Sequence, residues 1–332
     1  MKVSIRDISR ATGLSPATIS NALNHKKGVN EETARKVMEA AARMGYLNEN
    51  KVTKIKFVIF RKNGLIIDDS QFHPAVIEGV EEEAKESGFE TVFVNLDRNS
   101  PSFEREVKEI ISDCTAAVIL LGTEIMEEDY PFFADHSCQL ILLDGWSDQY
   151  AFDSVLIANT DSAHYATRYL IERGHERIGY IRGDFRISAF RYREIGFTRA
   201  MMEANLPINK NYFATVGTKM PTAYQGTRAY LDSAKELPTA FFADNDEIAM
   251  GAMRAIKEKG YRIPEDISII GFDDIAFGAI SNPTLSTVHV YKQEMGRAAV
   301  KRLREMMAGD TVFQKIQICE RFIERESVKD LR

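Results

Sequence analysis

The sequence predicts a small all-α head followed by a larger α/β body built on doubly wound parallel sheets. Residues 1–47 carry three short helical patterns separated by turns. From Ile55 onward, short apolar runs alternate with helical patterns, which is typical of parallel strands linked by helices. The alternation restarts after residues 154–159, so the body should contain two similar lobes. A chain of 332 residues is long enough for this arrangement.

The first two predicted helices flank a glycine turn. Ser4 starts helix one, and Asp7 can answer it in a capping-box arrangement. Gly13 ends this helix, because glycine tolerates positive φ. Ser15 caps helix two, and Pro16 takes its first position, where a missing N–H costs nothing. The apolar residues expected to face inward are Ile5, Ile8, Ala11, Ile19 and Leu23.

A third helix should lie between Asn30, its cap, and Gly45, its stop. Its expected buried stripe is Ala34, Val37, Ala41 and Met44. Residues 1–56 hold eleven lysines and arginines and five acids, a charge of +6, while the whole chain carries −6, which leaves −12 for the rest. A basic head on an acidic body indicates that the head alone meets a polyanion. A helix-turn-helix places its second helix in the DNA major groove, and the alternative is a helical bundle that binds nothing.

The body alternates between two kinds of pattern. The expected strands are 55–60, 90–95, 116–121, 139–144, 154–159, 177–181, 212–216, 239–243 and 267–272. The expected helices are 74–87, 102–112, 127–134, 162–173, 190–204, 222–234 and 246–259. The strand patterns are nearly continuous apolar runs, as in parallel strands that are covered on both faces.

Composition and motifs exclude several classes of protein. No apolar run is long enough to span a membrane and no secretory signal opens the chain, so we expect a cytoplasmic protein. The three cysteines, Cys114, Cys138 and Cys319, lie far apart in sequence and should be reduced. The chain has no phosphate-binding glycine motif, no metal-ligand set and no nucleophile–base set. We therefore expect no cofactor, no metal and no catalytic residue, and we assign His175 a structural role.

Two long segments also resemble a known family. Residues 1–24, MKVSIRDISRATGLSPATISNALN, and residues 28–46, GVNEETARKVMEAAARMGY, are similar to the headpiece of the lactose-repressor (LacI/GalR) family of bacterial transcription regulators. The resemblance continues through nearly the whole chain and implies a two-lobed, periplasmic-binding-protein-like body. The implied divisions are a headpiece at 1–47, a linker at 48–54, an N-lobe at 55–157 and 289–318, and a C-lobe at 158–288 and 319–332.

The same resemblance assigns contacts to DNA. The residues at phosphate-contacting positions are Ser4, Ser15, Thr18, Ser20 and Asn24. Pro16, Ala17 and Asn21 occupy base-reading positions, and relatives commonly carry arginine at the third of these. Because asparagine pairs with adenine and arginine prefers guanine, we expect an A·T pair there. We also expect a homodimer on pseudo-palindromic double-stranded DNA, since two heads would read two half-sites.

A small-molecule site is expected between the lobes, because ligands of such sheets bind at the carboxyl ends of strands. Phe72 and His73 match the position of the family's paired aromatics, with His73 replacing the second ring, and Arg193 matches the ligand-binding arginine of its R-x-x-G-F motif. The expected effector contacts are Phe72, His73, Thr123, Asp144, Trp146, Arg193, Asn245 and Asp273. Alternatively, these residues are caps, turn residues or contacts between lobes. Loop 217–222 lacks the pocket aromatic that relatives often carry there.

These features together predict an effector-controlled repressor of carbohydrate-utilisation genes that responds to a sugar. The alternatives are a sugar-binding protein without a regulatory role and an enzyme on a doubly wound fold. Relatives join head and body through a P-N-x-x-A-R-x-L helix whose Leu wedges into the minor groove. Here LNENKVTK follows Tyr46, and Ile55 lies only nine positions beyond that tyrosine. We expect a plain linker, with neither Leu47 nor Val52 acting as a wedge.

Overall fold

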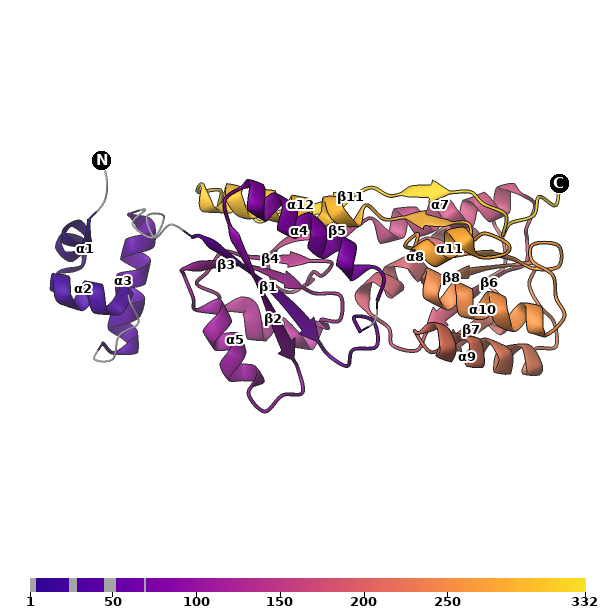
Figure 1. Cartoon of the computed structure of the whole chain (residues 1–332), viewed down its shortest axis with the longest axis horizontal. Coiled ribbons are helices and arrows are strands. Elements are labelled where there is room, and N and C mark those ends of the chain that lie inside the picture. Colours follow the sequence, from indigo (N-terminus) through magenta and orange to yellow (C-terminus); the bar gives the residue numbers. More distant parts are fainter. Residues whose placement is uncertain (1–3, 24–28, 45–51, 69) are drawn as a thin grey trace.

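The computed structural model describes residues 4–23, 29–44, 52–68 and 70–332. These residues form a small helical head and a long body of two α/β lobes (Figure 1). Most of the expected linker 48–54 lies outside the described residues, and so do Asn24 and Leu47. Val52 is described, and its half-buried side chain packs against the hydrophobic core of the N-lobe.

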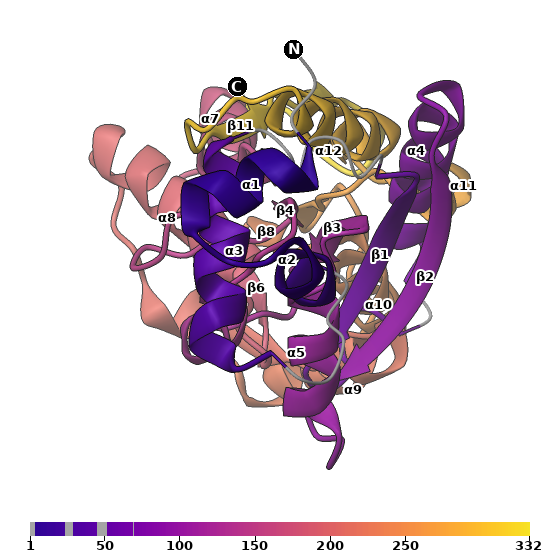
Figure 2. The same ribbon diagram turned by 90° about the vertical axis from the view of Figure 1, so that its left-hand side faces the viewer.

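Three short helices make up the head, which lies in front of the body in Figure 2. They are α1 (Ile5–Thr12), α2 (Pro16–Leu23) and α3 (Glu31–Arg43). The head has its own buried core, which consists of Ile8, Ile19, Ala22, Val37, Ala40 and Ala41. Ala11, which the helical spacing placed on the inner face, is exposed instead. A helix this short buries only one narrow stripe, and Ile8 occupies it in α1.

The ends of these helices carry the expected caps. The Ser4 N–H donates to Asp7 Oδ2 over 2.9 Å, and Gly13 follows α1 with a φ of 72°. At the start of α2, Ser15 Oγ accepts from the Thr18 N–H over 3.1 Å. Asn30 Oδ1 accepts from Thr33 in the same way over 2.7 Å at the start of α3. Each of these bonds satisfies a backbone group that the helix itself leaves unpaired.

A parallel six-stranded sheet forms the centre of the N-lobe, in the order β11-β5-β4-β3-β1-β2. Its strands are β1 (Lys54–Arg61), β2 (Glu90–Asp97), β3 (Ala116–Leu121), β4 (Leu140–Leu143), β5 (Asp153–Ile157) and β11 (Lys315–Ile318). Helices α4 (His73–Glu86) and α12 (Lys292–Met307) cover one face and pack side by side (Figure 1). Helices α5 (Phe103–Ile111) and α6 (Pro131–Ala134) cover the other face.

The C-lobe is built around a parallel four-stranded sheet in the order β7-β6-β8-β9. Its strands are β6 (Ile178–Gly183), β7 (Phe213–Val216), β8 (Ala240–Ala243) and β9 (Ser268–Ile270). Helices α7 (Asn159–Glu172) and α8 (Ser188–Glu203) pack on one face. Helices α9 (Met220–Ser233) and α10 (Asp246–Glu258) pack on the other, and α11 (Ala276–Ile280) follows β9.

Three segments of the chain cross between the lobes. The first joins β5 to α7, the second joins β10 (Thr287–His289) to α12, and the third joins β11 to β12 (Arg321–Ile323). Strands β10 and β12 pair antiparallel beside the last two crossings. Because the crossings are short, they can act as a hinge on which the lobes open and close.

Several predicted boundaries differ from the structure. Strand β5 ends at Ile157, since Asn159 already starts α7, so the expected strand 154–159 is too long. The expected helix 127–134 is divided into a 3₁₀ turn, Glu127–Asp129, and α6, because Pro131 lacks the N–H that a continuous helix would need. Strand β1 begins at Lys54, one residue inside the expected linker, where Lys54 pairs with Glu90 of β2.

Candidate functional site

One cavity between the two lobes brings together residues from distant parts of the chain. Seven of the eight expected effector contacts line it, namely Phe72, His73, Thr123, Asp144, Arg193, Asn245 and Asp273. Apolar side chains that also line it include Ile157, Ile187, Phe190 and Ile275. An apolar cavity with a few polar groups fixed at defined points is the usual form of a small-molecule site.

The N-lobe wall of this cavity carries a chain of three polar side chains. Thr123 Oγ1 donates to Asp144 Oδ2 over 2.7 Å, and His73 Nε2 lies 3.4 Å from Thr123 Oγ1. Two atoms of these three side chains, His73 Nδ1 and Asp144 Oδ1, are buried without a hydrogen-bond partner among the described residues. Buried polar atoms normally have partners, so unpaired atoms in a cavity point to a ligand.

Burial governs the protonation of this wall. It lowers the pKa of His73 to about 4; Glu124 opposes this shift and Lys219 adds to it, so the imidazole is neutral at pH 7. Burial raises the pKa of Asp144 to about 6, against the Thr123 hydrogen bond and the charge of Arg193. Asp144 also has a φ of 57°, a left-handed conformation that aspartate tolerates better than most residues.

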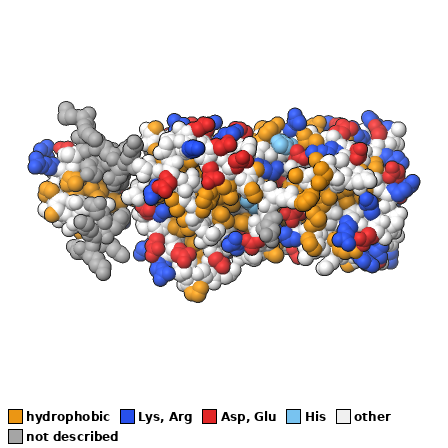
Figure 3. Space-filling model, in the orientation of Figure 1, with side chains coloured by type: hydrophobic (Ala, Val, Ile, Leu, Met, Phe, Trp, Pro, Cys, Tyr) orange, Lys and Arg blue, Asp and Glu red, His pale blue; other side chains and the backbone are white. Residues whose placement is uncertain are grey.

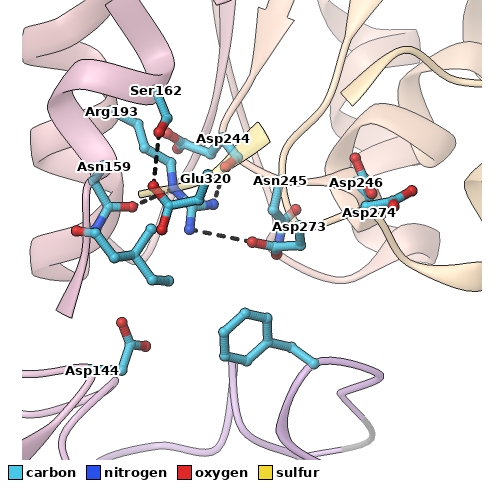
Figure 4. Close-up of polar contacts among 12 residues, drawn as sticks. Asp144, Asn159, Ser162, Arg193, Asp244, Asn245, Asp246, Asp273, Asp274 and Glu320 are labelled. Atoms are coloured by element: carbon cyan, nitrogen blue, oxygen red, sulfur yellow. Dashed lines mark hydrogen bonds and ion pairs between the residues drawn. The ribbon is translucent and has the colours of Figure 1, made fainter. Parts of the chain in front are cut away.

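The C-lobe wall centres on the buried guanidinium of Arg193, which is extended from α8 (Figure 4). Its Nε donates to Asn159 Oδ1 over 2.8 Å and its Nη1 donates to the Asp244 carbonyl oxygen over 2.6 Å. Its Nη2 lies 3.3 Å from Asp273 Oδ1, and the group stacks 3.7 Å from the centroid of Phe272. Every nitrogen of Arg193 therefore has a partner, and the charge of Arg193 is balanced by Asp273.

Asp273 is held in a strained backbone conformation at the edge of the cavity. Its φ is 109°, and its N–H donates to the Val288 carbonyl oxygen over 2.9 Å. Burial raises the pKa of its carboxyl group, while Arg193 and Lys292 counteract this shift. Strain of this kind persists where the surroundings fix the chain, and it gathers at functional sites.

For Asn245 and Trp146, the sequence left open whether each is an effector contact, a helix cap or a contact between lobes. Asn245 lines the cavity, and its Oδ1 also accepts from the Ile248 N–H over 3.0 Å as the cap of α10. Trp146 is not among the lining residues. Its ring instead packs edge-to-face on Tyr192 of the C-lobe, with ring centroids 4.7 Å apart. Trp146 is therefore a contact between lobes.

Other residues of the site were missed by the sequence analysis. Thr218 and Lys219 line the cavity from the C-lobe and bind backbone oxygens of the N-lobe. Thr218 Oγ1 donates to the Leu65 carbonyl oxygen over 3.0 Å, and Lys219 Nζ donates to the Ile66 carbonyl oxygen over 3.4 Å. The signal that would have found them is their position directly after β7, at the carboxyl end of a strand. These bonds close one side of the cavity.

Glu124 is the second omission, and it shapes the loop 62–67. This fully buried carboxylate accepts five backbone N–H groups from Lys62, Asn63, Gly64, Ile66 and Ile67, at 2.8–3.1 Å. Burial opposes ionisation, but the backbone hydrogen bonds outweigh it and hold the pKa of Glu124 below its ordinary value. Glu124 thereby fixes Leu65 and Ile66 at the cavity.

The head presents its expected DNA contacts around the start of α2. Ser4, Ser15, Pro16 and Ala17 are exposed, and Thr18, Ser20 and Asn21 are half-buried. Ile19 and Ala22 on the opposite face enter the core of the head. In the space-filling view, acidic and basic side chains are interspersed over the visible face of the body (Figure 3).

The described residues contain no group of three or more His, Cys, Asp or Glu side chains that could hold a metal ion. In that part of the chain no helix is long and apolar enough to cross a membrane. His175 is tied to Thr239 Oγ1 over 2.9 Å and to the Lys329 carbonyl oxygen over 3.1 Å. These bonds join the segment between α7 and β6 to Thr239, which precedes β8, and to the C-terminal tail, away from the cavity lining.

Comparison with known proteins places both parts of the chain. Residues 4–49 match the model of bacterial regulatory proteins, lacI family, and residues 167–328 match a periplasmic binding protein-like domain. The chain is 30% identical over 304 residues to the HTH-type transcriptional repressor PurR of Pasteurella multocida, covering 91% of each protein. It is 29% identical to PurR of Haemophilus influenzae (strain PittEE), covering 98% of this chain and 99% of that relative.

Solved structures share the whole architecture. A transcriptional regulator CelR–cellobiose complex superposes with a TM-score of 0.74 at 23% identity, covering 98% of this chain and 99% of that one. The lac repressor dimer bound to operator and the anti-inducer ONPF superposes with a TM-score of 0.72 at 21% identity, covering 99% of this chain and 100% of that one. The helical head and the two-lobed body are thus a known combination.

Proposed function

This chain belongs to the lacI family of bacterial regulatory proteins, and from that premise we propose that a small molecule held between its lobes controls its binding to DNA. The chain is a DNA-binding transcriptional repressor. The observation that carries the proposal is the cavity between the lobes, where two buried polar atoms lack partners among the residues that the structure describes. A ligand that bridges the two walls stabilises one arrangement of the lobes over another.

The proposed effector is a neutral carbohydrate. The charges along the cavity are nearly balanced: Arg193 and Lys219 are basic, Asp144, Glu247 and Asp273 are acidic, and Arg193 is paired with Asp273. A phosphate group would meet these carboxylates, and the arginine of the lining, Arg193, is already paired with Asp273. Hydroxyl groups suit the unpaired atoms, and Phe72 adds an apolar surface of the kind that sugar rings contact. The cellobiose named for one structural neighbour has this chemistry.

The proposed DNA complex is a homodimer on a pseudo-palindromic operator in the cytoplasm. Each head lays α2 in a major groove, with Ser4, Ser15, Thr18 and Ser20 near phosphates. Pro16, Ala17 and Asn21 face base edges. Because two copies read two half-sites, the spacing between the heads decides affinity, and a change in lobe closure alters that spacing.

The test of this function combines ligand binding and DNA binding. Thermal unfolding is measured with a panel of neutral monosaccharides and disaccharides and with their phosphate esters, and any compound that raises the Tm is added to a gel shift with genomic operator fragments. We expect a neutral sugar to change operator affinity about 5- to 150-fold, the usual range of coupling between sites. A phosphate ester that acts better than its parent sugar would contradict the proposed effector class.

Asp273→Ala provides the matching variant. Asp273 lines the cavity and lies in the body, so its loss should abolish the response to effector and leave operator binding nearly intact. Asp148→Ala is the control, because Asp148 is an exposed aspartate outside the cavity lining. A normal response in Asp273→Ala would show that the effector binds elsewhere.

A further inference from the structure

We propose that His73 and Asp144 together select an effector that presents two neighbouring hydrogen-bond donors, one to His73 Nδ1 and one to Asp144 Oδ1. This inference rests on the function proposed above and deepens it. Both atoms are buried, both belong to side chains that line the cavity, and neither has a partner among the described residues. His73 would then be a residue that determines specificity.

The order of the hydrogen bonds fixes which nitrogen of His73 carries the proton. Thr123 has one hydroxyl hydrogen, and it is donated to Asp144 Oδ2 over 2.7 Å. Thr123 Oγ1 can therefore only accept from His73 Nε2, which lies 3.4 Å away. The imidazole is neutral, so a proton on Nε2 leaves Nδ1 without one. His73 Nδ1 is thus an acceptor.

The second unpaired atom is an acceptor as well. Asp144 uses Oδ2 for Thr123, and its Oδ1 is buried without a partner among the described residues, in a side chain that lines the cavity. Water can donate to both atoms when the cavity is open. A ligand that displaces this water must supply donors of its own, or two buried acceptors lose their partners. Two hydroxyl groups of one sugar ring supply such a pair, whereas a carbonyl or carboxylate pointed at this wall does not.

The surroundings hold this wall rigid and set its charge. The Phe72 ring packs edge-to-face on His73 with centroids 5.3 Å apart, which limits rotation of the imidazole. The charges of Glu124 and Lys219 shift the pKa of His73 in opposite directions. The charges of Arg193 and Asp273 likewise shift the pKa of Asp144 in opposite directions. Because these charges oppose one another, hydrogen bonding rather than net charge discriminates between ligands at this wall.

The first measurement needs no ligand and reads the tautomer directly. Long-range ¹H–¹⁵N correlation spectra of the full chain with labelled histidine distinguish a proton on Nε2 from one on Nδ1. Two other histidines supply references: His175 Nε2 faces the Lys329 carbonyl oxygen, and His136 Nδ1 faces the Cys138 carbonyl oxygen over 3.0 Å. Since a carbonyl only accepts, the neutral ring of His175 carries its proton on Nε2 and the neutral ring of His136 carries its proton on Nδ1.

We expect His73 to give the same pattern as His175, and we expect Thr123→Val to abolish that preference while Thr123→Ser keeps it. Single His→Gln variants assign the signals. The pattern of His136 at His73 would overturn the proposal whether or not any sugar binds. This outcome is independent of the gel shift that tests the proposed function.

The second measurement uses the neutral sugar that raises the Tm most, together with its analogues that replace one hydroxyl by fluorine, which cannot donate. His73→Asn keeps an acceptor near the Nδ1 position and should retain affinity within a few-fold. His73→Phe removes the acceptor but keeps a ring, and it should weaken binding about tenfold, with loss of discrimination against one fluorinated analogue. Equal binding to His73→Phe and the unmodified protein, or no shift with any sugar, would overturn the proposed donor pair.

Discussion

Replacing Glu124 by glutamine tests whether this buried carboxylate holds the loop that forms one side of the cavity. The change keeps the size of the side chain and removes its charge and half of its accepting capacity. In the native protein, Oε2 accepts from Lys62, Asn63 and Gly64, and Oε1 accepts from Ile66 and Ile67. In Glu124→Gln, one of the two positions becomes an NH₂ group that can only donate.

The size of the effect follows from the number of backbone donors left without a partner. In the more favourable orientation the glutamine oxygen takes the place of Oε2, so the N–H groups of Ile66 and Ile67 are orphaned. Each buried unsatisfied group costs about 1–3 kcal/mol, so Glu124→Gln should lower the free energy of unfolding by about 2–6 kcal/mol. That is a large share of the roughly 5–15 kcal/mol that stabilises a typical domain.

Urea unfolding at pH 7, followed by fluorescence, measures this change, because Trp146 is the one tryptophan and follows β4 in the N-lobe. Glu128→Gln is the matched control: its carboxylate is 68% exposed and pairs with Lys62, so its loss should cost about 1 kcal/mol or less. A loss below about 1 kcal/mol in Glu124→Gln would refute the role assigned to the five hydrogen bonds.

The stability lost in Glu124→Gln should depend on pH in a defined direction. The pKa of Glu124 in the folded protein lies below its ordinary value of 4.5. Its carboxylate therefore contributes stability above the unfolded pKa, and this contribution is lost as the pH falls through the folded pKa. The difference in unfolding free energy between Glu124→Gln and the unmodified protein should shrink below pH 4.5. A difference that stays constant down to pH 3 would contradict this.

Three further predictions concern DNA. If a dimer neutralises about 6–10 phosphates, raising salt from about 50 to 200 mM should lower operator affinity about 10³–10⁵-fold in a filter-binding assay. An operator affinity that does not change with salt would refute the head as the DNA-binding part. Asn21→Ala should cost about 1–3 kcal/mol per half-site and relax preference for A·T at one position, whereas selection from random DNA that returns G·C there would exclude this contact. A bending assay should show little central kink, since Val52 packs on the N-lobe; a kink lost in Val52→Ala would identify a wedge instead.

Much of the architecture could be read from the sequence because it depends on local rules. Ser15 and Asn30 cap their helices as expected, since a cap is a bond between residues three positions apart. The strand 116–121 coincides with β3 because its six residues are all apolar and all buried. The family resemblance, together with the rule that ligands bind where parallel strands end, also assigned eight effector contacts, and seven of them line one cavity.

The tertiary structure alone decided what those residues do. His73 and Thr123 lie 50 positions apart, and Glu124 and Ile66 lie 58 apart, so no periodicity in the sequence records either contact. Whether Arg193 is free to bind a ligand also depends on three partners from separate segments. The sequence determined which elements form, because helix caps and strand patterns follow from neighbours along the chain. Only packing of the two lobes decided which polar atoms there are satisfied and which are left for a ligand, because hydrogen bonding depends on distances that the folded chain sets.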